Sequence, residues 1–182
     1  MSDKHRRFET QALPHLDAAY NLARWLARPP VDADDIVQDA MLRAFRSFDT
    51  FRGDNVKPWL LAIVRNCFLT AVGQPRLKVD VPLPADNDGA ATDRSLTVDS
   101  PDPEAALIQA EQGCRLGDVI ATLPRDFREV LILREMEDLS YREIAQITGA
   151  PIGTVMSRLA RARALLKEKW LSDVRGVHHA VQ

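Results

Sequence analysis

The sequence contains only two cysteines among its 182 residues, Cys67 and Cys114, which stand 47 residues apart. That number and spacing exclude a disulfide scaffold and a CxxC metal site. No apolar run reaches the roughly 20 residues that a membrane-spanning helix needs, and no apolar signal core follows the charged N-terminus. We therefore expect a cytoplasmic protein without membrane insertion.

Signatures of catalysis are missing as well. The chain has no GxxxxGK(S/T) phosphate loop, no nucleophile elbow, no HExxH helix and no paired-carboxylate constellation. Its four histidines have no partners at the spacing of metal ligands. The sequence thus predicts a protein that is not an enzyme and needs no metal or other cofactor.

Charge is unevenly distributed along the chain. Residues 1–76 hold 11 Lys/Arg and 9 Asp/Glu, residues 77–112 hold 2 and 8, and residues 113–182 again hold 11 and 9. The acidic middle also contains four prolines, and a segment of this composition cannot bury enough apolar surface to offset its ordering entropy. We interpret residues 77–112 as a flexible acidic linker, whose last part could begin the next domain.

The N-terminal half repeats its apolar residues with the period of a helix and shows almost no strand-like alternation. A first helix should carry Leu13, Leu16, Tyr20 and Ala23 on one face and end at Pro29-Pro30. A second should start behind an Asp32 cap and bury Ile36, Val37, Ala40, Met41, Ala44 and Phe45. A third should start near Pro58 and bury Leu60, Ile63, Val64 and Cys67.

The C-terminal half predicts a helix-turn-helix. Ser140 and Glu143 have the spacing of a capping box, Gly149 can end that helix, and a basic amphipathic helix follows. In such a motif the second helix enters the major groove of DNA. A basic but merely solvated surface helix is the alternative. The predicted fold is therefore all-α, with two small helical domains at 1–76 and 113–172, the linker between them, and a tail at 173–182.

Several segments together carry a family likeness. They are Asp34–Phe45, Phe51–Gly53, Trp59–Asn66, Leu123-Pro124, Arg128–Arg134, Leu139–Ala145 and Gly153–Arg163. In these segments the chain resembles the extracytoplasmic-function (ECF) group of bacterial RNA polymerase sigma factors, over nearly its whole length. The resemblance implies a subunit that binds core RNA polymerase and directs initiation at promoter DNA, and that is held inactive by an anti-sigma factor.

The resemblance also assigns roles to residues of the first domain. Docking on core polymerase would use the exposed face of the second helix, at Asp35, Gln38, Asp39 and Leu42. Recognition and melting of the −10 element would use Phe51, Arg52, Lys57, Trp59, Arg65 and Asn66. The aromatic members of this set could instead be core residues. One departure from the family is that Cys67–Gln74 contains no charge, which reduces the expected phosphate contacts.

In the second domain the resemblance implies that the last helix reads the −35 element. Its candidate residues are Thr154, Met156, Ser157, Arg158, Arg161 and Arg163. Several relatives have a basic residue where this chain has Met156, so base preference should differ here. Two other interpretations are a helix-turn-helix regulator that does not act as a sigma subunit, and an adaptor that works by protein contact alone.

Overall fold

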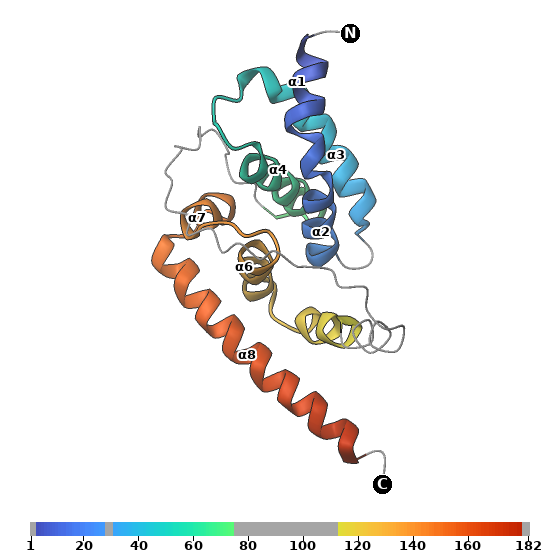
Figure 1. Ribbon diagram of the computed structural model, residues 1–182, viewed down its shortest axis with the longest axis vertical. Coiled ribbons are helices and arrows are strands. Elements are labelled where there is room, and N and C mark those ends of the chain that lie inside the picture. The colour runs from blue at the N-terminus through green and yellow to red at the C-terminus, as the bar shows by residue number, and fades with distance from the viewer. Residues whose placement is uncertain (1–2, 28–30, 75–112, 180–182) are drawn as a thin grey trace, which may run out of the picture.

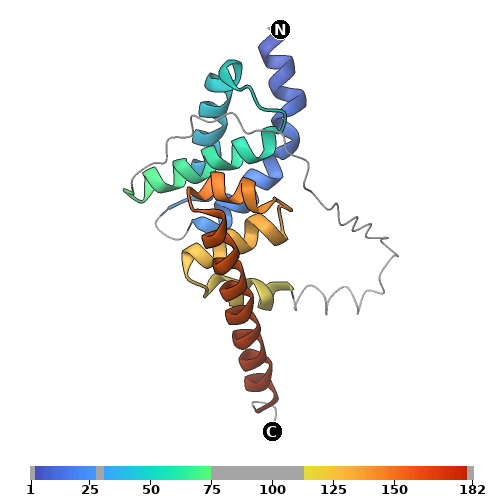
Figure 2. The same cartoon turned by 90° about the vertical axis from the view of Figure 1, so that its left-hand side faces the viewer.

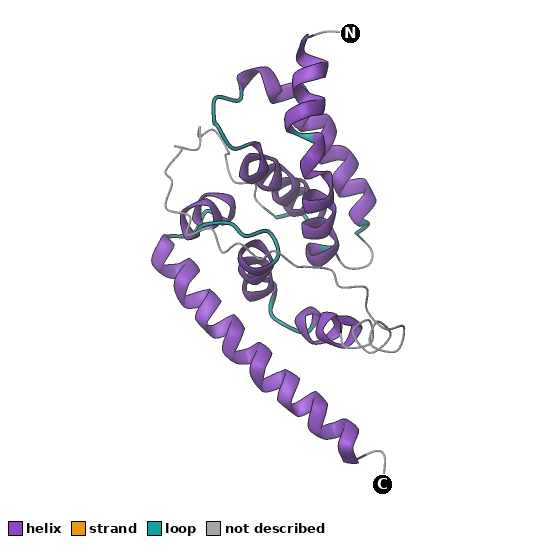
Figure 3. Cartoon of the chain, in the orientation of Figure 1, coloured by secondary structure: helices purple, strands orange, loops and turns teal. Residues whose placement is uncertain are grey.

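The computed structural model describes residues 3–27, 31–74 and 113–179, and all regular structure within these ranges is helical (Figures 1 and 3). The predicted all-α class is confirmed. The expected linker at 77–112 lies outside the described residues.

The N-terminal domain is built around α4, which packs against both α2 and α3. Two short 3-10 turns complete the domain, η1 (Leu13–His15) and η2 (Phe48–Thr50). Its helices are α1 (Asp3–Gln11), α2 (Leu16–Leu26), α3 (Ala33–Ser47) and α4 (Val56–Ala71).

The first of these helices was not expected, and α2 buries a different stripe from the one singled out in the sequence. Leu13, Leu16 and Tyr20 are exposed. The residues of α2 that enter the core repeat at i, i+3, i+4 and i+7, and they are Ala19, Leu22, Ala23 and Leu26. Both stripes satisfy the helical period, so contacts with α3 and α4 decide which one is buried. In α1, Phe8 supplies the buried anchor among nine mostly polar residues.

Helices α3 and α4 follow their predictions closely. The Asp32 side chain accepts a hydrogen bond from the Asp34 amide, 2.9 Å away, at the start of α3. Helix α4 starts at Val56, where the Asn55 side chain accepts from the Lys57 amide at 3.2 Å. Each cap satisfies one of the free amides at a helix start, a contribution of about 1 kcal/mol.

The C-terminal domain begins with a helical segment at 113–121, followed by α6 (Arg125–Glu135), α7 (Tyr141–Thr148) and α8 (Ile152–His179). The Ser140–Glu143 capping box is present at the start of α7. Gly149 ends α7 with φ 67°, the left-handed conformation that favours glycine. The predicted helix-turn-helix is therefore formed by α7 and α8.

Helix α8 is longer than expected. It runs to His179, so the segment from residue 173 starts within a helix rather than in a tail. No proline follows Pro151, and the residues after Ala160 are mostly strong helix formers. In Figures 1 and 2 the C-terminal half of α8 extends away from the N-terminal domain.

The two domains pack directly against each other. Helix α2 contacts α6 and α4 contacts α7 (Figure 1). Buried apolar residues of both domains form one continuous cluster, with Leu22, Leu60 and Val64 on one side and Leu133 and Ile144 on the other. Burial of one such side chain contributes about 1.5–3 kcal/mol. The cluster therefore stabilises each domain and also the packing of the two domains against each other, which is called the closed arrangement.

Candidate nucleic-acid and partner interfaces

The first turns of α8 place polar and basic side chains on the outer face of the helix-turn-helix. Ser157 is exposed and its hydroxyl donates to the Thr154 carbonyl oxygen at 3.0 Å, while Met156 is 51% exposed. On the opposite side of the helix, Val155 and Leu159 are buried against the domain core. The helix is thus fixed by its apolar side, and its polar side is open to a ligand.

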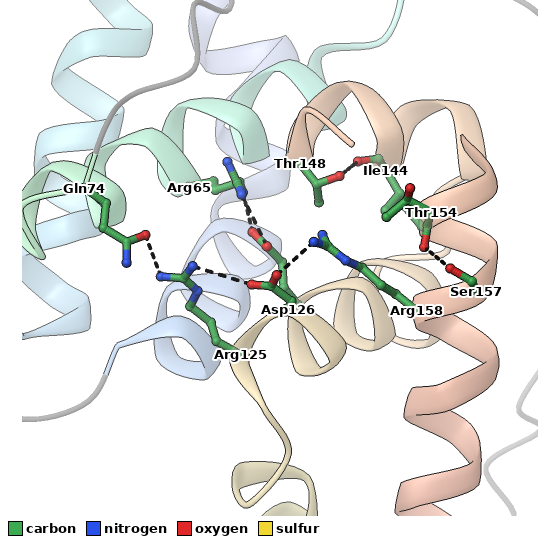
Figure 4. A network of polar contacts seen from close by, with 10 residues as sticks. Arg65, Gln74, Arg125, Asp126, Ile144, Thr148, Thr154, Ser157 and Arg158 are labelled. Carbon is green, nitrogen blue, oxygen red and sulfur yellow. Dashed lines mark hydrogen bonds and ion pairs between the residues drawn. The ribbon is translucent and has the colours of Figure 1, made fainter. Parts of the chain in front are cut away.

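Arg158 and Arg161 line one open groove of about 490 Å³. The groove lies between the start of α6 and the first turns of α8, and its other lining residues are Pro124, Arg125, Asp126, Phe127, Thr154 and Ser157. The Arg158 guanidinium forms an ion pair with Asp126 at 2.9 Å (Figure 4). Arg161 is exposed and pairs with no carboxylate of the described residues.

Arg163 differs from Arg161 in having a partner. Its Nη2 and Nε lie 2.6 and 3.0 Å from Glu135 Oε1. This contact raises the pKa of the guanidinium further above its ordinary value. Of the three arginines proposed from the sequence, two are therefore held by carboxylates of α6, and Arg161 is the one whose charge is unpaired within the described part of the chain.

The aromatic residues of the N-terminal domain form a packed group. Phe48 and Trp59 are buried, and the half-buried Phe51 packs on Trp59 with ring centroids 4.8 Å apart. Arg52 is exposed, and its Nη1 donates to the carbonyl oxygen of Asp49 at 2.7 Å. Of the aromatic −10 candidates, the structure places Trp59 in the core and leaves Phe51 at its edge.

The basic −10 candidates on α4 face the C-terminal domain. Lys57 Nζ lies 3.0 Å from Glu137 Oε2 and donates to the Glu137 carbonyl oxygen at 2.8 Å. The Arg65 guanidinium pairs with Glu129, and both side chains are buried (Figure 4). Asn66 is half-buried on the same helix. The structure therefore brings Lys57 and Arg65 together in the contact between the domains.

Glu129 is a buried carboxylate in an otherwise apolar stretch of α6. Burial raises the pKa of its carboxyl above the usual value, and the positive charge of Arg65 opposes that rise. The sequence analysis assigned no role to Glu129 or Glu137, and it gave Glu143 only its part in the capping box with Ser140. A charged residue among Val130, Leu131 and Leu133 is the one local sign that could have singled out Glu129.

The proposed polymerase-docking face of α3 is accessible. Asp35 and Gln38 are exposed, and the Leu42 side chain between them and the end of the helix is 51% exposed. Asp39 forms an ion pair with Arg43 one turn further along, at 2.7 Å, and this contact raises the pKa of the Arg43 guanidinium. Acidic and apolar groups thus share one exposed helix face.

The described part of the chain contains neither a metal site nor a membrane-spanning helix. Within it, no group of His, Cys, Asp and Glu is arranged to hold a metal ion. None of the described helices is long and apolar enough to cross a membrane. Cys67 is buried and Cys114 is exposed, and the two do not form a disulfide bond.

Two family models match the chain, Sigma-70 region 2 over residues 13–75 and Sigma-70 region 4 over residues 115–166. The ECF RNA polymerase sigma-E factor of Haemophilus influenzae is 36% identical over 152 residues, which are 81% of this chain and 78% of that protein. The chain belongs to the ECF sigma factors of RNA polymerase. As a sigma factor, it directs promoter-specific transcription.

Other relatives agree with this assignment. The ECF RNA polymerase sigma-E factor of Escherichia coli K12 is 37% identical over 150 residues, covering 78% of this sigma factor and 75% of that protein. The ECF RNA polymerase sigma factor SigE of Mycolicibacterium smegmatis is 33% identical over 155 residues. That match covers 85% of this chain but 58% of the relative, so the chain spans little more than half the length of this longer protein.

Solved structures show the same fold. The sigma factor RpoE of Bartonella quintana, solved in complex with the anti-sigma factor NepR, superposes with a TM-score of 0.65 at 28% identity. The match covers 92% of this chain and 99% of that one. The structure of CnrH in complex with the cytosolic domain of CnrY gives a TM-score of 0.63 at 23% identity, a likeness of fold.

Proposed function

We propose that this sigma factor docks on core RNA polymerase through α3, contacts the −10 element through α4 and the loop before it, and reads the −35 element through α8. The observation that carries this division is the exposed acidic and apolar face of α3 together with the polar and basic outer face of the first turns of α8. The two basic residues of α4, Lys57 and Arg65, are paired with glutamates of the C-terminal domain. In this role the protein catalyses no covalent chemistry itself, and it acts in the cytoplasm, where bacterial polymerase and promoters lie.

The proposal for the −35 element is supported by the groove beside α8. Thr154 and Ser157 offer hydroxyls for base edges, and Arg161 offers a phosphate a charge that no carboxylate of the described residues pairs. Met156 protrudes from the same surface and can make only apolar contact, for example with a thymine methyl group. Arg158 and Arg163 would have to exchange a carboxylate for DNA.

For the −10 element, the exposed Arg52 offers a charge for a phosphate, and Phe51 is the aromatic residue with surface available to a base. Lys57 would have to exchange Glu137 for a phosphate. Arg65 and Asn66 extend this set along α4. Trp59 is buried, so we propose that it supports Phe51 by packing and does not itself contact a nucleotide.

For core polymerase, Asp35, Gln38 and Asp39 supply acidic and polar groups that fit a basic partner surface, and Leu42 supplies an apolar contact at its centre. We also propose an anti-sigma factor as a regulator, because the Bartonella quintana sigma factor with the same fold was solved with one.

Run-off transcription tests the proposal. Purified core polymerase is incubated with a pool of genomic fragments, with and without the protein, and the transcripts are mapped. Start sites that appear only with the protein, and that share two spaced upstream elements, are the expected result. Binding to duplex DNA without any new transcript would instead support a helix-turn-helix regulator, and binding to neither DNA nor polymerase would support an adaptor.

A further inference from the structure

The first turns of α8 expose apolar side chains as well as polar ones. Ile152 is 43% exposed and Met156 is 51% exposed, and Ala160 is exposed one turn further along. The three residues are spaced four apart, so they follow one another along one side of the helix. Together they form an apolar strip on α8. None of the three lines the groove between α6 and α8.

The apolar strip takes no part in the packing that holds α8 in place. Its residues belong neither to the core cluster of the described residues nor to the partly buried apolar residues packed on that cluster. The same turns of the helix are anchored instead by Val155 and Leu159, which are buried. A single exposed apolar residue is ordinary on a protein surface. Large neighbouring ones, Ile152 and Met156, present a continuous apolar surface to a ligand of α8.

The charge around the strip favours DNA over a protein as that ligand. Residues 152–167 contain four Lys/Arg and no Asp or Glu. Arg161, in the middle of this segment, pairs with no carboxylate of the described residues. A positive surface of this kind attracts DNA phosphates. The Ser157 side chain, which follows Met156 along the chain, adds a hydroxyl group that can meet a base edge (Figure 4).

Gly153 leaves room for a close approach beside the strip. Glycine stabilises a helix less than alanine does, so its presence in the first turn of α8 needs a reason. A Cβ atom at this position would meet no atom within 4 Å, so packing inside the protein does not require glycine. Met156 and Ser157 are its neighbours one turn along the helix. The missing side chain lets base edges come near the backbone at that point.

The major groove offers one apolar group that matches the strip. It is the C5 methyl group of thymine, and 5-methylcytosine carries the same group. Ile152 and Met156 can make only apolar contacts, so they do not distinguish the oxygen on C4 of thymine from the amino group on C4 of cytosine. Four residues of helix rise about 6 Å, which is less than two base-pair steps of about 3.4 Å each. The two side chains therefore fit methyl groups on pyrimidines one or two base pairs apart.

We propose that the apolar strip of α8 determines −35 specificity by packing against the C5 methyl groups of closely spaced pyrimidines. The inference rests on the proposed −35 role of α8. It adds Ile152 and Ala160 to the residues that contact DNA. It also names the chemical group that the strip recognises, a methyl group supplied by thymine or by 5-methylcytosine.

The test removes the methyl groups from the DNA and leaves base pairing unchanged. Duplex libraries with a randomised segment are selected on holoenzyme reconstituted from core polymerase and the full chain. One library contains the natural bases, one has deoxyuridine in place of thymidine, and one has 5-methylcytosine in place of cytosine. Because deoxyuridine lacks only the C5 methyl group, any difference between the first two libraries reports on contact with that group.

Two double variants accompany the parent chain. The strip variant carries Ile152→Ala and Met156→Ala. A matched control carries Met136→Ala and Leu171→Ala, which shorten apolar side chains of similar exposure, 50% and 45%, away from the first turns of α8. All four side chains are exposed, so neither variant removes a core contact. Both variants should bind polymerase as the parent does in a pull-down, since none of these residues lies on α3.

We expect the parent to select thymine at one or two positions of the upstream element and to lose that preference in the deoxyuridine library. On one selected duplex, replacing such a thymidine by deoxyuridine should weaken binding about fourfold, the effect of one buried methyl group. The replacement should have no effect on the strip variant, whereas the control should respond like the parent. Enrichment of 5-methylcytosine at the same positions would show that either base can supply the methyl group, and its absence would identify thymine as the source; both results support the proposal.

Three outcomes would overturn the proposal. They are equal selection from the natural and deoxyuridine libraries, an undiminished deoxyuridine effect in the strip variant, and loss of polymerase binding in that variant, which would make the strip a protein contact. If the parent still selects an upstream element in these cases, the −35 role of α8 stands and only this inference fails. If it selects no upstream element and run-off transcription fails as well, the proposed function is refuted together with the inference.

Discussion

Arg161 offers the sharpest test of how α8 contacts DNA. It is exposed in the groove beside α8 and pairs with no carboxylate of the described residues, whereas Arg163 is held by Glu135 through two nitrogens. Both residues are arginines on the same helix, two positions apart. Charge alone predicts that the two arginines contribute equally to DNA binding. Their different pairing predicts that Arg161 contributes more than Arg163.

We expect Arg161→Ala to remove one full phosphate contact. Each such contact contributes about 0.9 to the slope of log K against log salt concentration. Between 50 and 200 mM salt, the ratio of parent to variant affinity should then change by a factor of about 3.5. Arg163→Ala should change the slope less, because Arg163 must give up Glu135 to reach DNA, and an exposed ion pair is worth up to about 1 kcal/mol.

The assay is promoter binding by the reconstituted holoenzyme, measured at several salt concentrations on duplex DNA that carries both elements. Polymerase binding should be the same in both variants, since neither residue lies on α3. A slope unchanged by Arg161→Ala, or a larger change with Arg163→Ala, would refute the reasoning. Loss of polymerase binding in Arg161→Ala would refute the division of roles between the helices.

Three further substitutions test other parts of the structure. Asp39→Arg should weaken polymerase binding in a pull-down. The circular dichroism spectrum should not change, because the ion pair of Asp39 with Arg43 contributes only about 0.3–0.5 kcal/mol to stability. Unchanged affinity would remove Asp39 from the docking face. Met156→Arg should shift selection from a randomised −35 library toward guanine, which arginine binds with two hydrogen bonds, and an unchanged selection would place residue 156 away from the bases. Ser140→Ala should lower the free energy of unfolding by about 1 kcal/mol, because it removes half of the capping box with Glu143. The melting temperature should then fall by about 2–4 °C, and an unchanged melting temperature would mean that the cap does not stabilise α7.

Local signals in the sequence were sufficient for most of the helices. Asp32, Ser140 with Glu143, and Gly149 each act through neighbours within four residues, and the structure confirms all three. Their chemistry depends on the backbone nearby, which the sequence specifies directly. Helix α1 lacked such a signal, because nine mostly polar residues with one buried Phe8 gain their helical order from contact with the rest of the domain.

The contact between domains could not be predicted in the same way. Arg65 and Glu129 are 64 residues apart, and Lys57 and Glu137 are 80 apart. Each of these side chains has an ordinary local interpretation, as a basic DNA-facing residue or as a solvated acid. Only the packing of α4 on α7 and of α2 on α6 turns them into partners. The proposed site was thus predictable as a set of residues, but its covered state was not.

The closed arrangement also separates the proposed surfaces by accessibility. Asp35, Gln38 and Leu42 are open on α3 while Lys57 and Arg65 are covered. The proposed docking face on α3 is therefore accessible in the closed chain, whereas the proposed −10 groups Lys57 and Arg65 are held by glutamates of the C-terminal domain. A partner shifts a population only toward the form that it binds more tightly. On the proposed roles, docking on α3 would therefore expose Lys57 and Arg65 only if polymerase bound the open form more tightly than the closed one.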